Sequence, residues 1–188
     1  MYSKIIAVTN RHLACRPYFE QIGRICRMHP RALILREKDL PEKEYLDLAR
    51  DVLEICERYG VPMIPHYYPS AADLTGTGRV HLPLWKLEAL RAGAQDFRGE
   101  AGCSVHSLEE AVRAEELGAV YLTAGHIFET DCKRRTAGRG LAFLKEVCGA
   151  VKIPVYAIGG IQPDPEQIAA ICACGAAGAC IMSGMMKL

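Results

Sequence analysis

Short apolar runs and longer amphipathic segments alternate along the chain. The apolar runs predict eight strands, at residues 5–9, 32–36, 62–66, 79–82, 102–105, 119–124, 154–158 and 179–182. Several of these runs are apolar almost without interruption, which is typical of parallel strands that are buried on both faces. Eight such strands separated by helical segments indicate a parallel sheet built of βαβ units.

Local signals place three of the helices. Between residues 41 and 59, apolar side chains recur at the three- and four-residue spacing of one buried helix face. Ser107 is followed three residues later by Glu110, a capping-box pattern that predicts a helix over residues 108–117. Asp164 can cap a helix that starts at Pro165 and stops near Gly175. The pattern of residues 69–98 is too weak to place their helices.

The number of βα units favours a closed barrel over an open sheet. The first βα turn lacks the Gly-x-Gly-x-x-Gly pattern of dinucleotide-binding folds. We therefore expect an α/β fold, a single (β/α)8 TIM barrel, with one domain over residues 1–188. The sequence ends a few residues after the last predicted strand, so we expect the final outer helix to be short or missing.

Composition narrows the class of protein. Of the 188 residues, 50% are hydrophobic, and the formal net charge of +1 gives no reason to expect a nucleic-acid or anionic-membrane partner. The chain has no uninterrupted run of about 18 apolar residues, so we expect no membrane span. The nine cysteines include no Cys-x-x-Cys pair and lie mostly in apolar segments, which indicates reduced thiols in a cytoplasmic protein. Cys132, in a polar loop, is the best candidate for a reactive thiol.

Glycine-rich loops after the last two predicted strands form the first candidate site. Gly159 and Gly160 end one strand, and Ser183 and Gly184 follow Met182 at the end of the other. Glycine lets backbone N–H groups approach an anion closely, and the loops after strands seven and eight hold phosphate in many barrels. We predict a phosphate site here; the alternative is that these glycines only make tight turns.

A cationic strand end and a basic loop form two further candidates. Arg36 and Lys38 flank Glu37 and can bind phosphate or carboxylate, although a solvated strand end with an Arg–Glu pair fits equally well. Residues 125–140 form a long basic loop, which is typical of a lid over an anionic substrate. His126 starts this loop and can transfer protons near neutral pH, whereas a lone histidine is more often structural.

Other histidines also stand at predicted strand ends. His66, His81 and His106 have no acidic residues beside them at a fixed spacing, so we expect no metal site. The sequence assigns no role to these three side chains.

Several of these segments resemble the thiazole tautomerase (TenI-type) branch of the thiamin phosphate synthase family. The shared segments are residues 36–38, 104–111, 125–133, 157–160 and 182–184. The run Gly-His-Ile-Phe-Glu-Thr-Asp-Cys-Lys at residues 125–133 is specific to the tautomerase branch. The resemblance implies a phosphorylated thiazole as the substrate, no cofactor, and a homodimer.

The resemblance also implies an isomerase in thiamin biosynthesis. A thiazole tautomerase moves one proton of a non-aromatic carboxythiazole phosphate, and the ring becomes aromatic. On this reading the catalytic residue is His126, and Arg36 and Lys133 supply the anion-binding side chains. The thiazole-phosphate contacts fall on Thr130, Gly160, Met182 and Ser183.

The chain departs from the synthase branch of the same family. That branch couples a pyrimidine pyrophosphate to thiazole phosphate and holds Mg²⁺ with carboxylates after strands three and four. Here residues 65–68 read Pro-His-Tyr-Tyr and residues 81–86 read His-Leu-Pro-Leu-Trp-Lys, which leaves no oxygen ligand of the kind that Mg²⁺ prefers. The alternatives are thiamin phosphate synthase itself, a non-catalytic regulatory protein that binds thiazole phosphate, and a sugar-phosphate isomerase on the same barrel.

Overall fold

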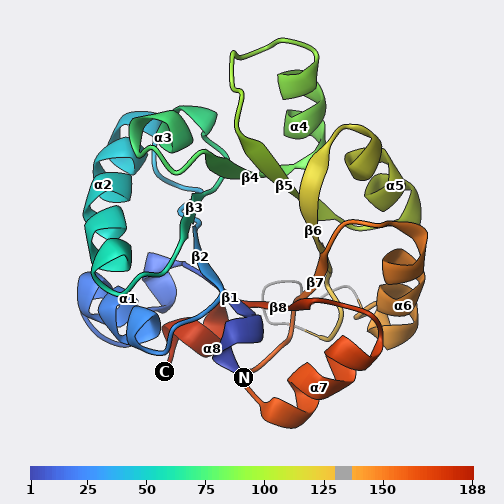
Figure 1. Cartoon of the computed structure of the whole chain (residues 1–188). Coiled ribbons are helices and arrows are strands. Elements are labelled where there is room, and N and C mark those ends of the chain that lie inside the picture. The colour runs from blue at the N-terminus through green and yellow to red at the C-terminus, as the bar shows by residue number, and fades with distance from the viewer. Residues whose placement is uncertain (130–136) are drawn as a thin grey trace.

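A computed structural model describes residues 1–129 and 137–188. Its strands form one eight-stranded parallel sheet in the order β3-β2-β1-β8-β7-β6-β5-β4, curled into a nearly closed barrel (Figure 1). The strands are β1 (Ile5–Val8), β2 (Ala32–Leu35), β3 (Met63–Pro65), β4 (Arg79–Pro83), β5 (Glu100–Val105), β6 (Ala119–Gly125), β7 (Val155–Ile158) and β8 (Gly178–Ile181). The predicted TIM-barrel fold is confirmed, and every predicted strand overlaps an observed one.

Helices alternate with the strands and surround the sheet (Figure 1). They are α1 (Tyr18–Arg27), α2 (Glu42–Arg58), α3 (Pro69–Leu74), α4 (Leu84–Arg91), α5 (Leu108–Glu116), α6 (Gly140–Ala150), α7 (Pro165–Ala173) and α8 (Ser183–Met186), with short 3-10 helices at Tyr2–Lys4 and Arg11–Leu13. The last helix has four residues, as expected for a shortened outer helix. Within the described ranges, no helix is long and apolar enough to cross a membrane.

The two predicted helix caps are present as hydrogen bonds. Ser107 Oγ accepts the N–H of Glu110 at 3.1 Å, and Asp164 Oδ1 accepts the N–H of Gln167 at 2.8 Å. Each cap satisfies a backbone donor of the first helical turn that has no partner within the helix. The reciprocal bond of the predicted capping box is displaced by one residue, because Glu110 Oε2 accepts the N–H of His106 at 2.6 Å.

The two edges of the sheet, β3 and β4, meet without a continuous ladder. One isolated bridge joins His66 to His81, and the N–H of Tyr67 donates to the carbonyl of His81 at 2.9 Å. On the opposite side of the barrel, β1 pairs with β8 through a regular parallel ladder. The barrel is therefore weakly joined at one seam, and both histidines of that seam are buried.

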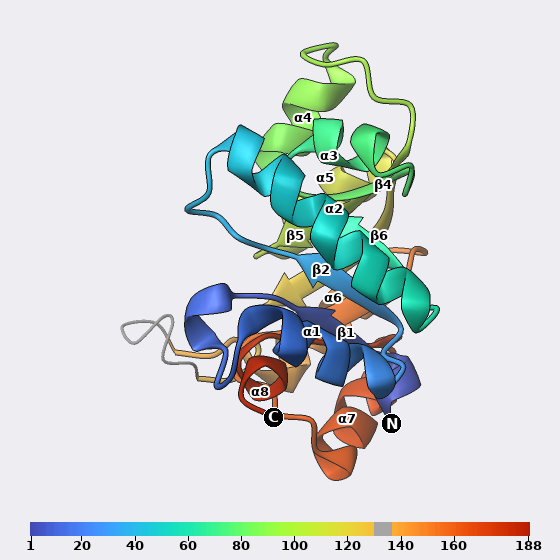
Figure 2. The same ribbon diagram turned by 90° about the vertical axis from the view of Figure 1, so that its left-hand side faces the viewer.

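Two hydrophobic clusters fill the molecule. The larger lies between the strands and the surrounding helices, and the smaller is made by side chains that point to the inside of the barrel, including Ile6, Val8, Ile34 and Cys180. Successive strand residues point to opposite faces, so each strand supplies both clusters. Figure 2 shows the chain termini at the same end of the molecule, with α8 beside α1. The interior cluster closes the barrel below its mouth, where the candidate site lies.

Candidate ligand-binding site

A cavity of about 540 Å³ opens at the carboxyl ends of the strands. This end of a (β/α)8 barrel carries the active site in characterised enzymes of the fold. Its floor is apolar and includes Val8, Ile34, Ile158 and Cys180, while polar and charged side chains come from the loops above. The cavity brings together most of the residues predicted from the sequence, namely Arg36, Lys38, His126, Gly159, Gly160, Met182 and Ser183.

The glycines after β7 have a backbone that other residues rarely adopt. Gly159 has φ +101° and Gly160 has φ +69°. A Cβ at Gly159 would lie 2.3 Å from Cβ of His126, and one at Gly160 would lie 2.3 Å from the carbonyl oxygen of Glu129. Both positions therefore need glycine for the turn and for close packing against the loop after β6. The predicted phosphate contact at these two residues stays a prediction.

The end of β8 supplies part of the same wall. Met182 and Ser183 line the cavity, whereas Gly184 is outside its lining. A Cβ at Gly184 would lie 2.8 Å from Gln162 Oε1 and 2.9 Å from Pro163 Cδ. The structure thus explains this glycine by the close approach of α8 to the loop after β7.

Glu37 holds the loop after β1 through its buried carboxylate. Its carboxylate is buried and accepts hydrogen bonds from Thr9 Oγ1 at 2.7 Å and Tyr18 Oη at 3.0 Å. The other oxygen accepts the N–H of Arg11 at 3.0 Å and lies 3.3 Å from its guanidinium. Burial and the nearby Glu37 charge raise the pKa of Tyr18 far above its ordinary value, so the phenol keeps its proton and donates.

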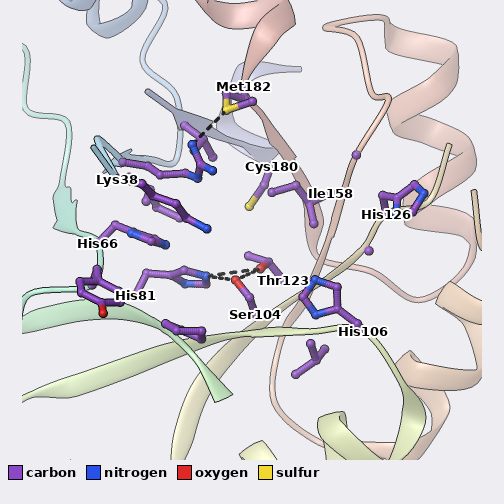
Figure 3. A pocket seen from close by; sticks show the side chains of 18 of the residues that line it. Lys38, His66, His81, Ser104, His106, Thr123, His126, Ile158, Cys180 and Met182 are labelled. Carbon is purple, nitrogen blue, oxygen red and sulfur yellow. Dashed lines mark hydrogen bonds between the residues drawn. The ribbon is translucent and has the colours of Figure 1, made fainter. Parts of the chain in front are cut away.

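The two cations that flank Glu37 face the cavity. Arg36 Nη1 lies 3.8 Å from Met182 Sδ, a contact that joins the ends of β2 and β8 (Figure 3). Lys38 reaches into the cavity from the β2 side, where Figure 3 shows it next to His66. Both cations therefore line one wall of the cavity, opposite Ile158 (Figure 3), and their predicted contact with an anion stays a prediction.

A buried polar network that the sequence did not predict lies across β4, β5 and β6. His81 Nδ1 is hydrogen-bonded to Tyr121 Oη at 2.9 Å, and His81 Nε2 to Ser104 Oγ at 2.8 Å (Figure 3). Thr123 Oγ1 donates to Ser104 Oγ at 3.2 Å. Burial lowers the pKa of His81 to about 3, so the imidazole is neutral at physiological pH and its two nitrogens have fixed partners.

His66 stands beside this network, with its ring centroid 5.9 Å from that of His81. Burial, followed by the charges of His81, Arg36, Lys38 and Lys86, lowers the pKa of His66 to about 2. Both histidines come from strand ends that the sequence did identify. Their neighbours at residues 104, 121 and 123 gave no signal beyond the strand alternation that points residues 121 and 123 to the same side.

The described residues do not fit a magnesium site of the kind that the synthase branch implies. Glu37 is the one carboxylate in the described lining of the cavity, and both of its oxygens are engaged by Thr9, Arg11 and Tyr18. Within residues 1–129 and 137–188, no group of three or more His, Cys, Asp or Glu side chains is placed to hold a metal ion. Mg²⁺ prefers several carboxylate or carbonyl oxygens, which this wall does not offer.

The remaining predicted residues lie at the edge of the cavity or outside the described ranges. His126 is buried at the end of β6, and Figure 3 shows its ring directed away from His66, His81 and Ser104. His106 lines the cavity and is half exposed, with Nδ1 3.5 Å from Glu110 Oε2. Thr130, Lys133 and the candidate thiol of Cys132 fall among residues 130–136, outside the part that the structure describes.

The family model and the relatives in sequence place the chain in one family. The model of the family described as thiamine monophosphate synthase matches residues 5–185. A putative thiamine-phosphate synthase 2 of Aquifex aeolicus is 34% identical over 166 residues, 88% of this chain and 89% of that protein. A thiamine-phosphate synthase of Pyrococcus horikoshii is 31% identical over 188 residues, 97% of this chain and 86% of that protein.

A solved structure gives the same result for the fold. The thiamine phosphate pyrophosphorylase of Pyrococcus furiosus superposes with a TM-score of 0.81 and 28% identity, covering 97% of this chain and 87% of that one. These relatives carry the name of a transferase. The isomerase class that we predicted from the sequence is therefore wrong, whereas the role of His126 in the site stays a prediction.

Proposed function

Because the chain belongs to the thiamine monophosphate synthase family, we propose that its cavity binds a phosphorylated thiazole and that it has the synthase activity for which its relatives are named. One observation carries the binding part of this proposal. The left-handed Gly159 and Gly160 and the Met182–Ser183 segment line the same cavity, above an apolar floor. A ligand with one phosphate and a small apolar ring matches such a site.

Each part of the proposed ligand has a position in the cavity that suits its chemistry. The phosphate would accept hydrogen bonds from the backbone N–H groups of Gly160 and Ser183, since glycine has no side chain of its own to cover its N–H. Arg36, held against Met182 at 3.8 Å, adds a charged donor at that end. The ring would lie on Ile158 and Val8 of the floor. We keep His126 as a predicted contact at the edge of this site and Lys38 as a predicted anion contact. Thr130 and Lys133 stay predicted contacts that lie outside the described residues.

A second candidate is a protein of the same family that binds thiazole phosphate without turning it over. The engagement of Glu37 by three residues favours it, since no carboxylate of the described lining is left for Mg²⁺. In that case the protein binds thiazole phosphate without a second substrate, and this binding regulates another protein or reaction.

Two measurements separate these candidates. Thiazole phosphate binding is measured by calorimetry, and thiamin phosphate formation is measured with pyrimidine pyrophosphate in Mg²⁺ and in EDTA. Product formation supports the synthase; binding without product in either buffer supports the second candidate; no binding overturns both. Arg36→Gln should weaken binding about tenfold, in the range of a charged hydrogen bond, while Arg24→Gln on the exposed face of α1 should not.

A further inference from the structure

The wall of the cavity made by the ends of β2, β3 and β4 concentrates positive charge. Lys38 and Arg36 line it, and the charges of both, with that of Lys86, act on the buried ring of His66. Figure 3 shows Lys38 and His66 together on this side, away from Ile158 and Cys180. Three cations gathered around one neutral imidazole attract an anion of more than one charge.

The backbone after β3 places Lys86 beside this wall, against Tyr67, which lines the cavity. Tyr67 has φ +75°, a left-handed conformation that a tyrosine rarely adopts. In this position its N–H binds the carbonyl of His81, and its ring lies 3.5 Å from Lys86 Nζ and 6.0 Å from the ring of Trp85. The strained residue thus holds an ammonium group against an aromatic face, beside the cavity.

The neutral histidines add hydrogen-bonding groups without adding charge. His81 is fixed by Tyr121 and Ser104, and its ring stacks on that of His66. The backbone N–H of His66 donates to Tyr45 Oη at 2.7 Å and to the carbonyl of Leu35 at 3.1 Å, which fixes the backbone of this residue against α2 and β2. A neutral imidazole has one N–H, which can donate to an anionic oxygen.

We propose that this wall is a metal-independent binding site for a diphosphate group, whose oxygens are held directly by Lys38 and the neutral ring of His66, with the charge of Lys86 beside them. The identity of the group rests on the proposed function, in which a pyrimidine pyrophosphate is the second substrate. Direct binding by cations follows from the wall itself, where the family would need a carboxylate-bound Mg²⁺ and the described lining offers only the engaged Glu37.

Inorganic pyrophosphate is the probe for this site. Trp85 is the single tryptophan of the chain and lines the cavity, so its fluorescence reports occupation of the wall. In EDTA, pyrophosphate should change this fluorescence with saturation, and an excess of Mg²⁺ should not strengthen the binding. Saturation that appears only when Mg²⁺ is added would overturn the proposal.

Variants test whether the charge of Lys86 carries the binding. Lys86→Gln should raise the dissociation constant for pyrophosphate about tenfold in EDTA, and Lys86→Arg should restore most of the affinity. Lys145→Gln, on the exposed face of α6, is the matched control with the same loss of charge. Equal affinities for Lys86→Gln and Lys145→Gln would also overturn the proposal.

The outcome is independent of the thiazole-phosphate test. If pyrophosphate binds without metal and thiazole phosphate does not bind, the cationic wall is confirmed and the proposed function is wrong. If thiazole phosphate binds and pyrophosphate requires Mg²⁺, the proposed function stands and this inference is wrong.

Discussion

At the scale of single residues, the barrel mouth depends on one buried carboxylate. Glu37 joins the end of β2 to the loop after β1 through Thr9, Arg11 and Tyr18. A sequence that reads Arg-Glu-Lys suggests a charged surface, but the structure turns the central residue inward and the two cations toward the cavity. The carboxylate orders the loop, and the two cations that flank it in the sequence line the cavity.

Replacing this carboxylate tests its structural role. Glu37→Gln keeps the shape and loses the charge, so we expect the free energy of unfolding to fall by about 1.5–3 kcal/mol, the range of hydrogen bonds to a charged group. Urea denaturation measures the change. Glu44→Gln, an exposed residue of α2, is the control and should stay within about 0.5 kcal/mol of the parent. Equal midpoints for the two variants would contradict this account of Glu37.

Comparing Gly160→Ala with Gly76→Ala separates the effect of close packing on stability from that of backbone conformation. The new Cβ would meet the carbonyl of Glu129 at 2.3 Å and Cβ of Phe128 at 2.7 Å, at φ +69°. We expect a loss of at least about 2 kcal/mol and weaker thiazole phosphate binding. Gly76→Ala has a similar φ of +63° with no atom within 4 Å, so it should cost only the backbone strain of about 1 kcal/mol. Similar losses in the two variants would show that the packing contact at Gly160 is unimportant.

At the scale of elements, the seam between β3 and β4 couples stability to pH. His66 and His81 are neutral when folded, with pKa values of about 2 and about 3 against 6.5 for an ordinary imidazole. Below pH 6.5 the unfolded chain therefore binds more protons than the folded one, and the free energy of unfolding falls as the pH falls toward 3. Each histidine contributes a slope of about 1.4 kcal/mol per pH unit across this window.

Removing one seam histidine should remove its share of the slope. We expect His66→Gln to reduce the pH dependence between pH 6 and pH 4 by about 1.4 kcal/mol per unit, measured by urea denaturation at each pH. His29→Asn, which removes an exposed histidine at a left-handed position suited to asparagine, is the control. An unchanged slope in His66→Gln would mean that its imidazole is not held neutral.

The sequence predicted the elements whose burial pattern is local. All eight strands were placed because parallel strands are apolar on both faces, and the caps at Ser107 and Asp164 were visible as three-residue patterns. α3 and α4 were missed because they have only six and eight residues, too few turns to show a buried face. The polar network was not predicted for a different reason. His81, Ser104 and Thr123 are distant in the sequence and meet only through the register of β4, β5 and β6.

At the scale of the whole molecule, the barrel is held by contacts between its first and last elements. β1 pairs with β8, and α8 packs on α1, where the buried Gln21 donates from Nε2 to the carbonyl of Met185 at 2.7 Å. The side chain of Met185 is fully buried. These contacts lie far from α4, the helix that contains Trp85 (Figure 1), which makes the two regions suitable for testing whether the barrel unfolds as one unit.

The substitution Met185→Ala tests whether the barrel unfolds as one unit. Truncating a fully buried methionine should lower the free energy of unfolding by about 2–5 kcal/mol, because apolar contacts are lost and a cavity is left. If residues 1–188 form one domain, this loss of stability affects the unfolding of the whole barrel. The urea transition followed by Trp85 fluorescence should then shift together with the transition followed by far-ultraviolet circular dichroism. Leu74→Ala, which truncates a side chain that is 42% exposed, should shift both transitions far less. A Trp85 transition that stays in place while the circular dichroism transition moves would show that the half of the barrel around β4 and α4 unfolds independently, and the one-domain interpretation would be wrong.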